Sequence, residues 1–233
     1  MKYRKTDNQE LMNPRNNISK IMTILEKHFN YQERTTLNKM RENLDDDKNP
    51  FKILIACLLS LRSRDETTEK ISQELFSIAD TPEKIIAIPT SRLEGIIYST
   101  GHYHKKAKSL KSVSQELIDR FKGIVPNTRE DLLSIKGIGP KTANIVLNFA
   151  YNQPTLPIDT HCHRIPNRLG WINTKTPEQT ETALYKVLPQ KYWFEFNGIF
   201  VLFGRTLCQP VSPWCSKCPV ERFCPKFNVK KRR

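Results

Sequence analysis

Four of the six cysteines lie within one short, proline-rich segment, CQPVSPWCSKCPVERFC. Their spacing is Cys208-x6-Cys215-x2-Cys218-x5-Cys224. Zinc ribbons and fingers use two pairs of ligands separated by a longer insert, whereas here one Cys-x-x-Cys pair is flanked by two single cysteines. The spacing therefore favours a [4Fe–4S] cluster over a zinc ion, with a disulfide as the third alternative. The other two cysteines lie far away in the sequence and read as ordinary buried residues.

A second segment that could do chemistry is LLSIKGIGPKTANIVLN. Gly137 and Gly139 separate two helical stretches, so that they predict a tight hairpin after which Pro140 begins the second helix. The free N–H groups of such a turn bind phosphate without reading the base sequence. Lys141 falls in the first turn, where the helix dipole disfavours its ammonium form and helps to free the amine as a nucleophile. The alternative is an exposed lysine that binds phosphate.

The third segment is IDTHCHRIPNRLG, in which Asp159 precedes a helical stretch that carries Arg164 and Arg168 on one face. Asp is a good N-cap, and a carboxylate held by helix N–H groups stays ionised and positioned, so that a structural and a catalytic role are compatible. His161 and His163 alternate along the helix and do not share a face. We therefore read them as structural or DNA-facing residues rather than metal ligands.

Charge and hydropathy narrow the class of protein. Of the 233 residues, 38% are hydrophobic and 27% are charged, and the net charge of +14 attracts polyanions, of which nucleic acid is the commonest inside cells. The alternative to a nucleic-acid-binding protein is a merely soluble basic protein.

The longest apolar run, Ile53 to Leu59, is too short to cross a bilayer, and the N-terminal sequence lacks the apolar core of a secretory signal. We expect a cytoplasmic protein whose thiols stay reduced.

Helices must position these residues, because apolar side chains recur at helical spacing and no stretch shows the alternation of a strand. The sequence therefore predicts an all-α fold. We expect residues 1–16 to be a flexible tail and the basic residues 230–233 to be a solvated end. The predicted helices cover residues 18–29, 67–78, 91–98, 110–121 and 194–207, and further helices begin at Thr81-Pro82, Thr128, Pro140 and Thr176. Residues 51–60 are apolar nearly all round, so they are a central buried helix or a buried strand, and their length and helical neighbours favour the helix.

The three segments, in this order and spacing, resemble the endonuclease III family of DNA glycosylases with AP-lyase activity, from about Ile53 to Cys224. The resemblance implies a helix-hairpin-helix fold with a DNA-binding cleft between two helical domains. One is a six-helix barrel over residues 46–152, and the other combines residues 17–45 with 153–226, flanked by tails 1–16 and 227–233. It also implies that Lys141 and Asp159 are catalytic. The implied ligands of a [4Fe–4S] cluster are Cys208, Cys215, Cys218 and Cys224.

Two further stretches extend the resemblance to the DNA. LLSLRSRDETT matches the segment that enters the space left by a flipped base, and TGHYHKKAK matches the loop that wedges into the duplex. Arg62 stands where bacterial members usually have Gln and looks more like the archaeal branch, while His102 stands where Leu is common. The DNA-binding residues implied in this way are Arg62, His102, Lys136, Gly137, Gly139 and Thr142.

The implied activity is base excision repair on double-stranded DNA, by a monomer, with oxidised pyrimidines as the expected lesions. A base leaves the stack, Lys141 attacks C1′ to form a Schiff base, and β-elimination breaks the strand on the 3′ side. Asp159 accepts the lysine proton or stabilises cationic character at C1′. The alternatives are a G/T or G/U mismatch glycosylase of the same fold and a non-catalytic iron–sulfur module that binds DNA. The pairing of Lys141 with Asp159 favours catalysis, because binding alone needs no such carboxylate.

Overall fold

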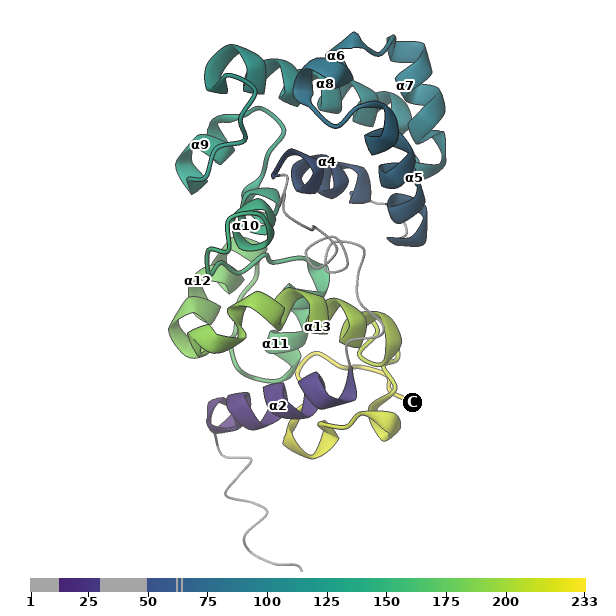
Figure 1. Cartoon of the computed structure of the whole chain (residues 1–233). Coiled ribbons are helices and arrows are strands. Elements are labelled where there is room, and N and C mark those ends of the chain that lie inside the picture. Colours follow the sequence, from purple (N-terminus) through teal and green to yellow (C-terminus); the bar gives the residue numbers. More distant parts are fainter. Residues whose placement is uncertain (1–12, 30–49, 62, 64) are drawn as a thin grey trace, which may run out of the picture. The chain divides into compact units, whose positions relative to one another are not determined.

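The computed structural model describes residues 13–29, 50–61, 63 and 65–233, and within them the chain forms helices and loops without a strand (Figure 1). This confirms the all-α fold. The chain divides into two compact units, one within Met1–Arg34 and Leu156–Arg233 and the other within Thr35–Thr155. Among the described residues, no helix combines the length and the apolar character needed to span a bilayer.

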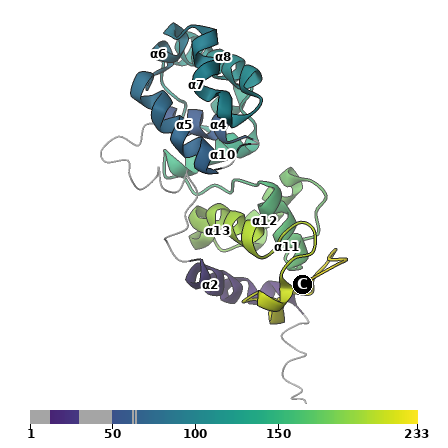
Figure 2. The ribbon, with the colours of Figure 1, turned by 90° about the vertical axis from the view of Figure 1, so that its right-hand side faces the viewer.

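The unit within Thr35–Thr155 is built around helix α4, whose side chains from Phe51 to Leu59 are buried with the single exception of Lys52. The helix favoured for residues 51–60 is therefore confirmed, and the alternative of a buried strand is wrong. Helices α5, α8 and α10 pack directly against α4 (Figure 2). The helices of this unit are α4 (Pro50–Ser60), α5 (Asp65–Ile78), α6 (Pro82–Ala87), α7 (Thr90–Ile97), η3 (Tyr98–Thr100), α8 (Tyr103–Phe121), α9 (Arg129–Ser134) and α10 (Pro140–Phe149).

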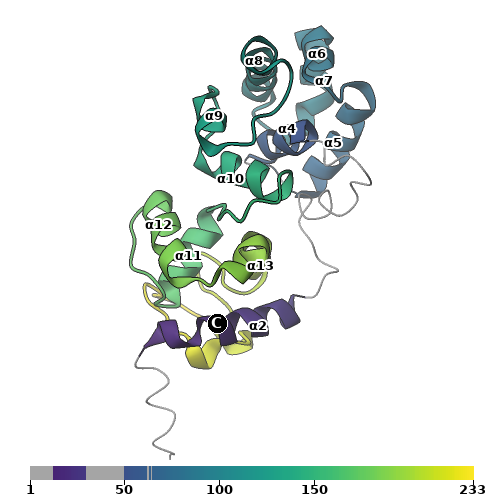
Figure 3. The ribbon, with the colours of Figure 1, turned by 60° about the vertical axis from the view of Figure 1, so that its left-hand side comes forward.

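The other unit packs around a cluster of aromatic side chains that includes Trp171, Phe196, Phe200 and Phe203. Helix α13 carries three of these rings and contacts both α2 and α11 (Figure 3). The elements of this unit are η1 (Pro14–Asn17), α2 (Ile18–His28), α11 (Thr160–Arg168), α12 (Pro177–Val187), η4 (Gln190–Tyr192), α13 (Trp193–Thr206), η5 (Cys215–Lys217) and η6 (Glu221–Phe223).

Threonine caps set the start of several helices, as the sequence indicated. The Thr128 hydroxyl accepts a hydrogen bond from the N–H of Asp131, and the Thr176 hydroxyl accepts one from the N–H of Gln179. Helix α8 begins seven residues earlier than expected, at Tyr103 rather than Leu110. The reason is that its first turn buries a lysine, Lys106, at a position where the periodic pattern requires an apolar side chain.

The two chain ends are more ordered than the sequence suggested. Residues 1–12 lie outside the described part, but the expected flexible tail does not reach residue 16, because Asn13 caps the helix η1 and Arg15 donates from Nε to the carbonyl of Trp171 (3.0 Å). The basic C-terminal end also contacts the rest of its unit. The N–H of Arg233 donates to the carbonyl of Pro213, and the carbonyl of Arg233 accepts from the N–H of Ser216. The guanidinium of Arg233 lies 4.0 Å from the ring centre of Trp214.

Candidate DNA-binding hairpin and cysteine site

The hairpin between α9 and α10 needs a glycine at one of its two glycine positions. Gly137 has φ = 98°, a conformation that L side chains rarely adopt. Gly139 instead has φ = −97° and ψ = 174°, which any residue can adopt. A Cβ atom built on Gly139 would meet no atom within 4 Å. The absence of a side chain there therefore leaves the hairpin backbone open to close approach.

The hairpin leaves several N–H groups available to a ligand. The N–H of Lys136 donates to Glu116 Oε1 (3.1 Å) and that of Ile138 donates to the carbonyl of Ile135 (3.1 Å). Within the described part of the chain, the exposed Gly137 and Gly139 have no such acceptor for their N–H groups. The first turn of α10 adds further N–H groups that have no acceptor inside the helix. Together these donors form a site for an anion such as a phosphate.

Lys141 is half-buried in the first turn of α10, next to the central helix α4. Burial raises the pKa of the Cys57 thiol on α4, and the positive charge of nearby Lys141 opposes that rise. Thr142 was expected among the DNA-binding residues. It is 5% exposed, and its hydroxyl accepts a contact from Cys57 Sγ at 3.7 Å. Its side chain therefore faces the core, and a DNA contact of this residue stays a prediction.

Asp159 is the N-cap of α11, as the sequence predicted. Its Oδ1 atom accepts hydrogen bonds from the N–H groups of His161 (2.9 Å) and Cys162 (2.7 Å). Burial raises the pKa of the Cys162 thiol well above its usual value, and the adjacent carboxylate raises it further. The helix N–H groups thus fix Oδ1 of this carboxylate.

The four clustered cysteines line one cavity. None of them is in a disulfide, so that alternative is wrong. Burial, together with the charge of the neighbouring cysteines, raises the pKa of Cys218 to about 12 and that of Cys224 to about 11. Thiols of this kind ionise near neutral pH only with a cationic partner. In the described ranges, no set of three His, Cys, Asp or Glu residues is arranged to hold a metal ion.

Two arginines of α11 hold the cysteine segment, a role that the sequence analysis missed. Arg164 donates to the carbonyl of Cys208 (2.8 Å). Arg168 is 6% exposed, donates to the carbonyls of Gln209 (2.7 Å) and Pro210 (2.6 Å), and lies 3.5 Å from Cys208 Sγ. The spacing of four residues placed both arginines on one face, but nothing local identified a partner forty residues away.

The histidines of α11 are structural. Nδ1 of His163 lies 2.6 Å from the hydroxyl of Thr180, in contact with α12. The ring of His161 covers Gly204 of α13, where an added Cβ would come within 2.1 Å of its Nδ1 atom. A glycine is therefore required at position 204 to admit this ring.

Arg62 and His102 are the two remaining residues that were predicted to contact DNA. Arg62 lies outside the described residues. His102 is exposed and caps the start of α8 in a left-handed conformation, with φ = 51°. It borders a hollow together with Leu58, Leu61 and Lys105. The loop therefore presents His102 at the surface, as a wedging residue requires.

Comparison with known proteins points to one family. The model of the HhH-GPD superfamily of base excision DNA repair proteins matches residues 55–190. Endonuclease III of Thermotoga maritima is 44% identical over 178 residues, which is 76% of this chain and 84% of the relative. Endonuclease III of Buchnera aphidicola is 34% identical over 205 residues, 85% of this chain and 95% of the relative.

Solved structures agree with the sequence relatives. A trapped covalent intermediate of endonuclease III and DNA has a TM-score of 0.72 and 34% identity, and covers 82% of this chain and 92% of its own. A thermostable thymine-DNA glycosylase has a TM-score of 0.76 at 24% identity, with 94% and 97% covered, and this likeness concerns the fold.

Proposed function

The chain belongs to the endonuclease III family of the HhH-GPD superfamily of base excision DNA repair proteins, and from this premise we propose how its residues carry out the reaction. It is a DNA glycosylase with AP-lyase activity. Its substrate in this proposal is double-stranded DNA that contains oxidised pyrimidines or abasic sites. We further propose that it works as a monomer in the cytoplasm.

The observation that carries the residue assignments is the hairpin, whose available N–H groups at Gly137 and Gly139 stand immediately before Lys141. A phosphate bound there places the neighbouring sugar close to the lysine amine. The neutral amine attacks C1′, the bond from C1′ to the base breaks, and the base leaves with the electron pair and takes up a proton. The bound amine loses one proton, the bond from C1′ to O4′ breaks as O4′ takes up a proton, and a protonated Schiff base remains between C1′ and Lys141.

Strand cleavage follows from the Schiff base. A proton leaves C2′, the 3′ phosphate departs by β-elimination, and water then releases the amine of Lys141. Asp159 supports the first step through Oδ2, which takes up the lysine proton or stabilises positive charge at C1′, while Oδ1 stays bound to the helix.

The substrate assignment is tested with a panel of duplexes that have the same sequence except for one damaged or mismatched base. Release of thymine or uracil opposite guanine, without release of oxidised pyrimidines, would contradict the assignment.

We propose that Cys208, Cys215, Cys218 and Cys224 hold a [4Fe–4S] cluster, which supplies four cationic iron atoms around which their segment folds. The shared cavity supports this proposal, because it is lined by all four cysteines. The buried guanidinium of Arg168 supports it further as a donor beside Cys208 Sγ. In this proposal the cluster is structural and stands outside the chemistry.

Metal analysis should find about four iron atoms and about four sulfides per chain in a brown protein, as a cubane cluster requires. Cys215→Ser should lose the iron and loosen the cysteine segment, while Cys57→Ser should retain it, because Cys57 is not among the residues that line the cavity. One zinc and no iron per chain would contradict the proposal.

DNA binding should depend strongly on salt, because the hairpin and the basic surface contact phosphates and release counterions. For six or more phosphate contacts, the binding constant should fall by about 10³-fold or more between about 50 and about 200 mM salt. Arg222→Gln should weaken binding of damaged and undamaged duplexes equally, since its guanidinium is exposed, 4.5 Å from the Phe223 ring centre. Lys226→Gln is the control, because Lys226 is paired with Glu221 at 3.2 Å. A binding constant that does not change with salt would exclude this interface.

A further inference from the structure

One lysine on α8 is buried in a way that phosphate binding does not explain. Lys106 is 8% exposed, and no other lysine among the described residues is buried. Its ammonium group faces main-chain carbonyls and a hydroxyl rather than a carboxylate. Burying a cation is costly unless its hydrogen bonds are satisfied, so a buried lysine on a surface helix points to a specific task.

Three segments of the chain meet at this ammonium. Nζ donates to the carbonyl of Leu59 at the end of α4 (2.8 Å), to the hydroxyl of Ser63 between α4 and α5 (2.6 Å), and to the carbonyl of Thr100 at the end of η3 (2.8 Å). The Ser63 hydroxyl donates in turn to the Thr100 carbonyl. One side chain thus ties the segment after α4 to the loop before α8.

The hydrogen count requires the charged form of the lysine. The carbonyls of Leu59 and Thr100 can only accept hydrogen bonds. The Ser63 hydroxyl donates its one hydrogen to the carbonyl of Thr100, so that toward Lys106 it can only accept. Nζ therefore donates three hydrogens, which a neutral amine does not have. Burial lowers the pKa of Lys106 to about 8, so the ammonium form is present at neutral pH.

The segment after α4 and the loop before α8 are the two segments that are expected to enter the DNA under the proposed function. Ser63 belongs to the segment expected to enter the space left by the flipped base, and Thr100 immediately precedes Gly101 and His102 of the wedging loop. Gly101 has φ = 68°, which glycine adopts freely, whereas His102 has φ = 51°, a left-handed conformation that costs energy for a residue with a side chain. The surrounding structure must hold His102 in this conformation, and the bond from Lys106 to the Thr100 carbonyl fixes the chain two residues before it.

We infer that Lys106 is a positioning residue for lesion recognition, which holds the two DNA-entering segments at a fixed spacing so that a base can be extruded and its space filled. This inference rests on the proposed function. It predicts different effects of a Lys106 substitution on two kinds of substrate. Base removal from a duplex needs both segments, whereas cleavage of an abasic site in a single strand needs no extrusion, only the lysine chemistry.

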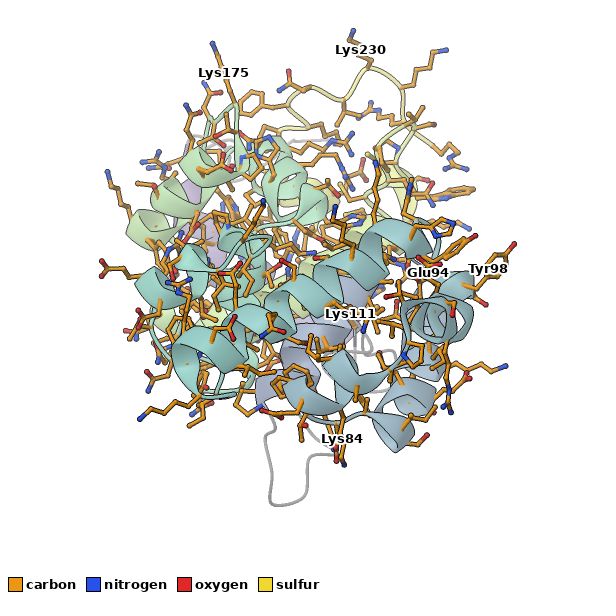
Figure 4. All side chains as sticks on the ribbon, turned by 90° about the horizontal axis from the view of Figure 1, so that it is seen from above. Lys84, Glu94, Tyr98, Lys111, Lys175 and Lys230 are labelled. Carbon is orange, nitrogen blue, oxygen red and sulfur yellow. The ribbon has the colours of Figure 1, made fainter. Side chains whose placement is uncertain are left out.

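The experiment compares single-turnover rates on these two substrates for the full-length protein. Lys106→Met should slow base removal from the duplex by about 10- to 100-fold, as small errors of positioning do, and leave cleavage of the single-stranded abasic oligonucleotide nearly unchanged. Lys106→Arg, which keeps the charge, should recover part of the duplex rate. Lys111→Met is the matched control. Lys111 lies on the same helix and is labelled in Figure 4, and it donates to the carbonyls of Ile86 (2.9 Å) and Ile88 (2.6 Å) instead.

Equal loss on both substrates, or no loss on either, would overturn the inference. If Lys106→Met does not fold, Ser63→Ala removes one acceptor only and should lower the ratio of duplex to single-strand rates in the same direction; an unchanged ratio would again overturn the inference. Cleavage of the single-stranded oligonucleotide by the unchanged protein and by Lys111→Met tests the proposed function separately, since that reaction does not involve the Lys106 contacts.

Discussion

Lys141→Gln should bind damaged duplex DNA with nearly unchanged affinity and leave the strand intact. An amide nitrogen cannot form a Schiff base, so strand cleavage should fall by on the order of 10⁴-fold or more, as expected when a covalent nucleophile is removed. Binding should persist because the N–H groups of the hairpin belong to the backbone. Gel-shift titration and single-turnover cleavage measure the two effects on one preparation.

Lys136→Gln is the control for this variant. Lys136 is exposed on the same hairpin, and its N–H is already bound by Glu116. Losing its side chain should weaken binding modestly and leave cleavage intact at saturating protein. If Lys141→Gln behaved in this way instead, Lys141 would be a phosphate-binding residue, and the proposed chemistry would be wrong.

Asp159→Asn should keep the fold and lose base removal. Asn caps a helix as well as Asp does, so that the N–H groups of His161 and Cys162 retain their acceptor. The carboxylate charge is lost, and the single-turnover rate of base release should fall by about 10² to 10⁴-fold, the usual range for a general acid–base group. Thermal unfolding of both proteins measures whether the cap survives.

Asp159→Ser separates the two roles of this residue further. Serine also caps, so stability should again change little, while base release should fall as in Asp159→Asn. Full activity in either variant would mean that Asp159 is only a cap. A loss of activity that parallels a large loss of stability would point to the same conclusion.

The features that the sequence predicted correctly depend on neighbours a few residues away. The caps at Thr128, Thr176 and Asp159 each use N–H groups two or three residues on, so residue type and spacing are enough to find them. The hairpin is similar, since Gly137 permits the positive φ of the turn and Pro140 begins the next helix. Local interactions therefore define both the hairpin and the capping carboxylate.

What the sequence could not predict depends on contacts across the fold. The burial of Thr142 follows from Cys57 on another helix, and the role of Arg168 follows from a segment forty residues away. Lys106 is the clearest case, because a lysine in the first turn of a helix ordinarily indicates an exposed side chain. Its three acceptors lie at the end of α4, between α4 and α5, and at the end of η3. A charged residue at a core position becomes meaningful only when its partners are seen.

Covalent trapping tests the central claim most directly. The unchanged protein is incubated with a duplex that contains one oxidised pyrimidine, sodium borohydride reduces any Schiff base, and mass spectrometry of the digested adduct locates the modified residue. The proposed mechanism predicts one DNA strand per protein, attached to the Nζ atom of Lys141. An adduct on another amine, or base release and strand cleavage without any trapped adduct, would contradict it.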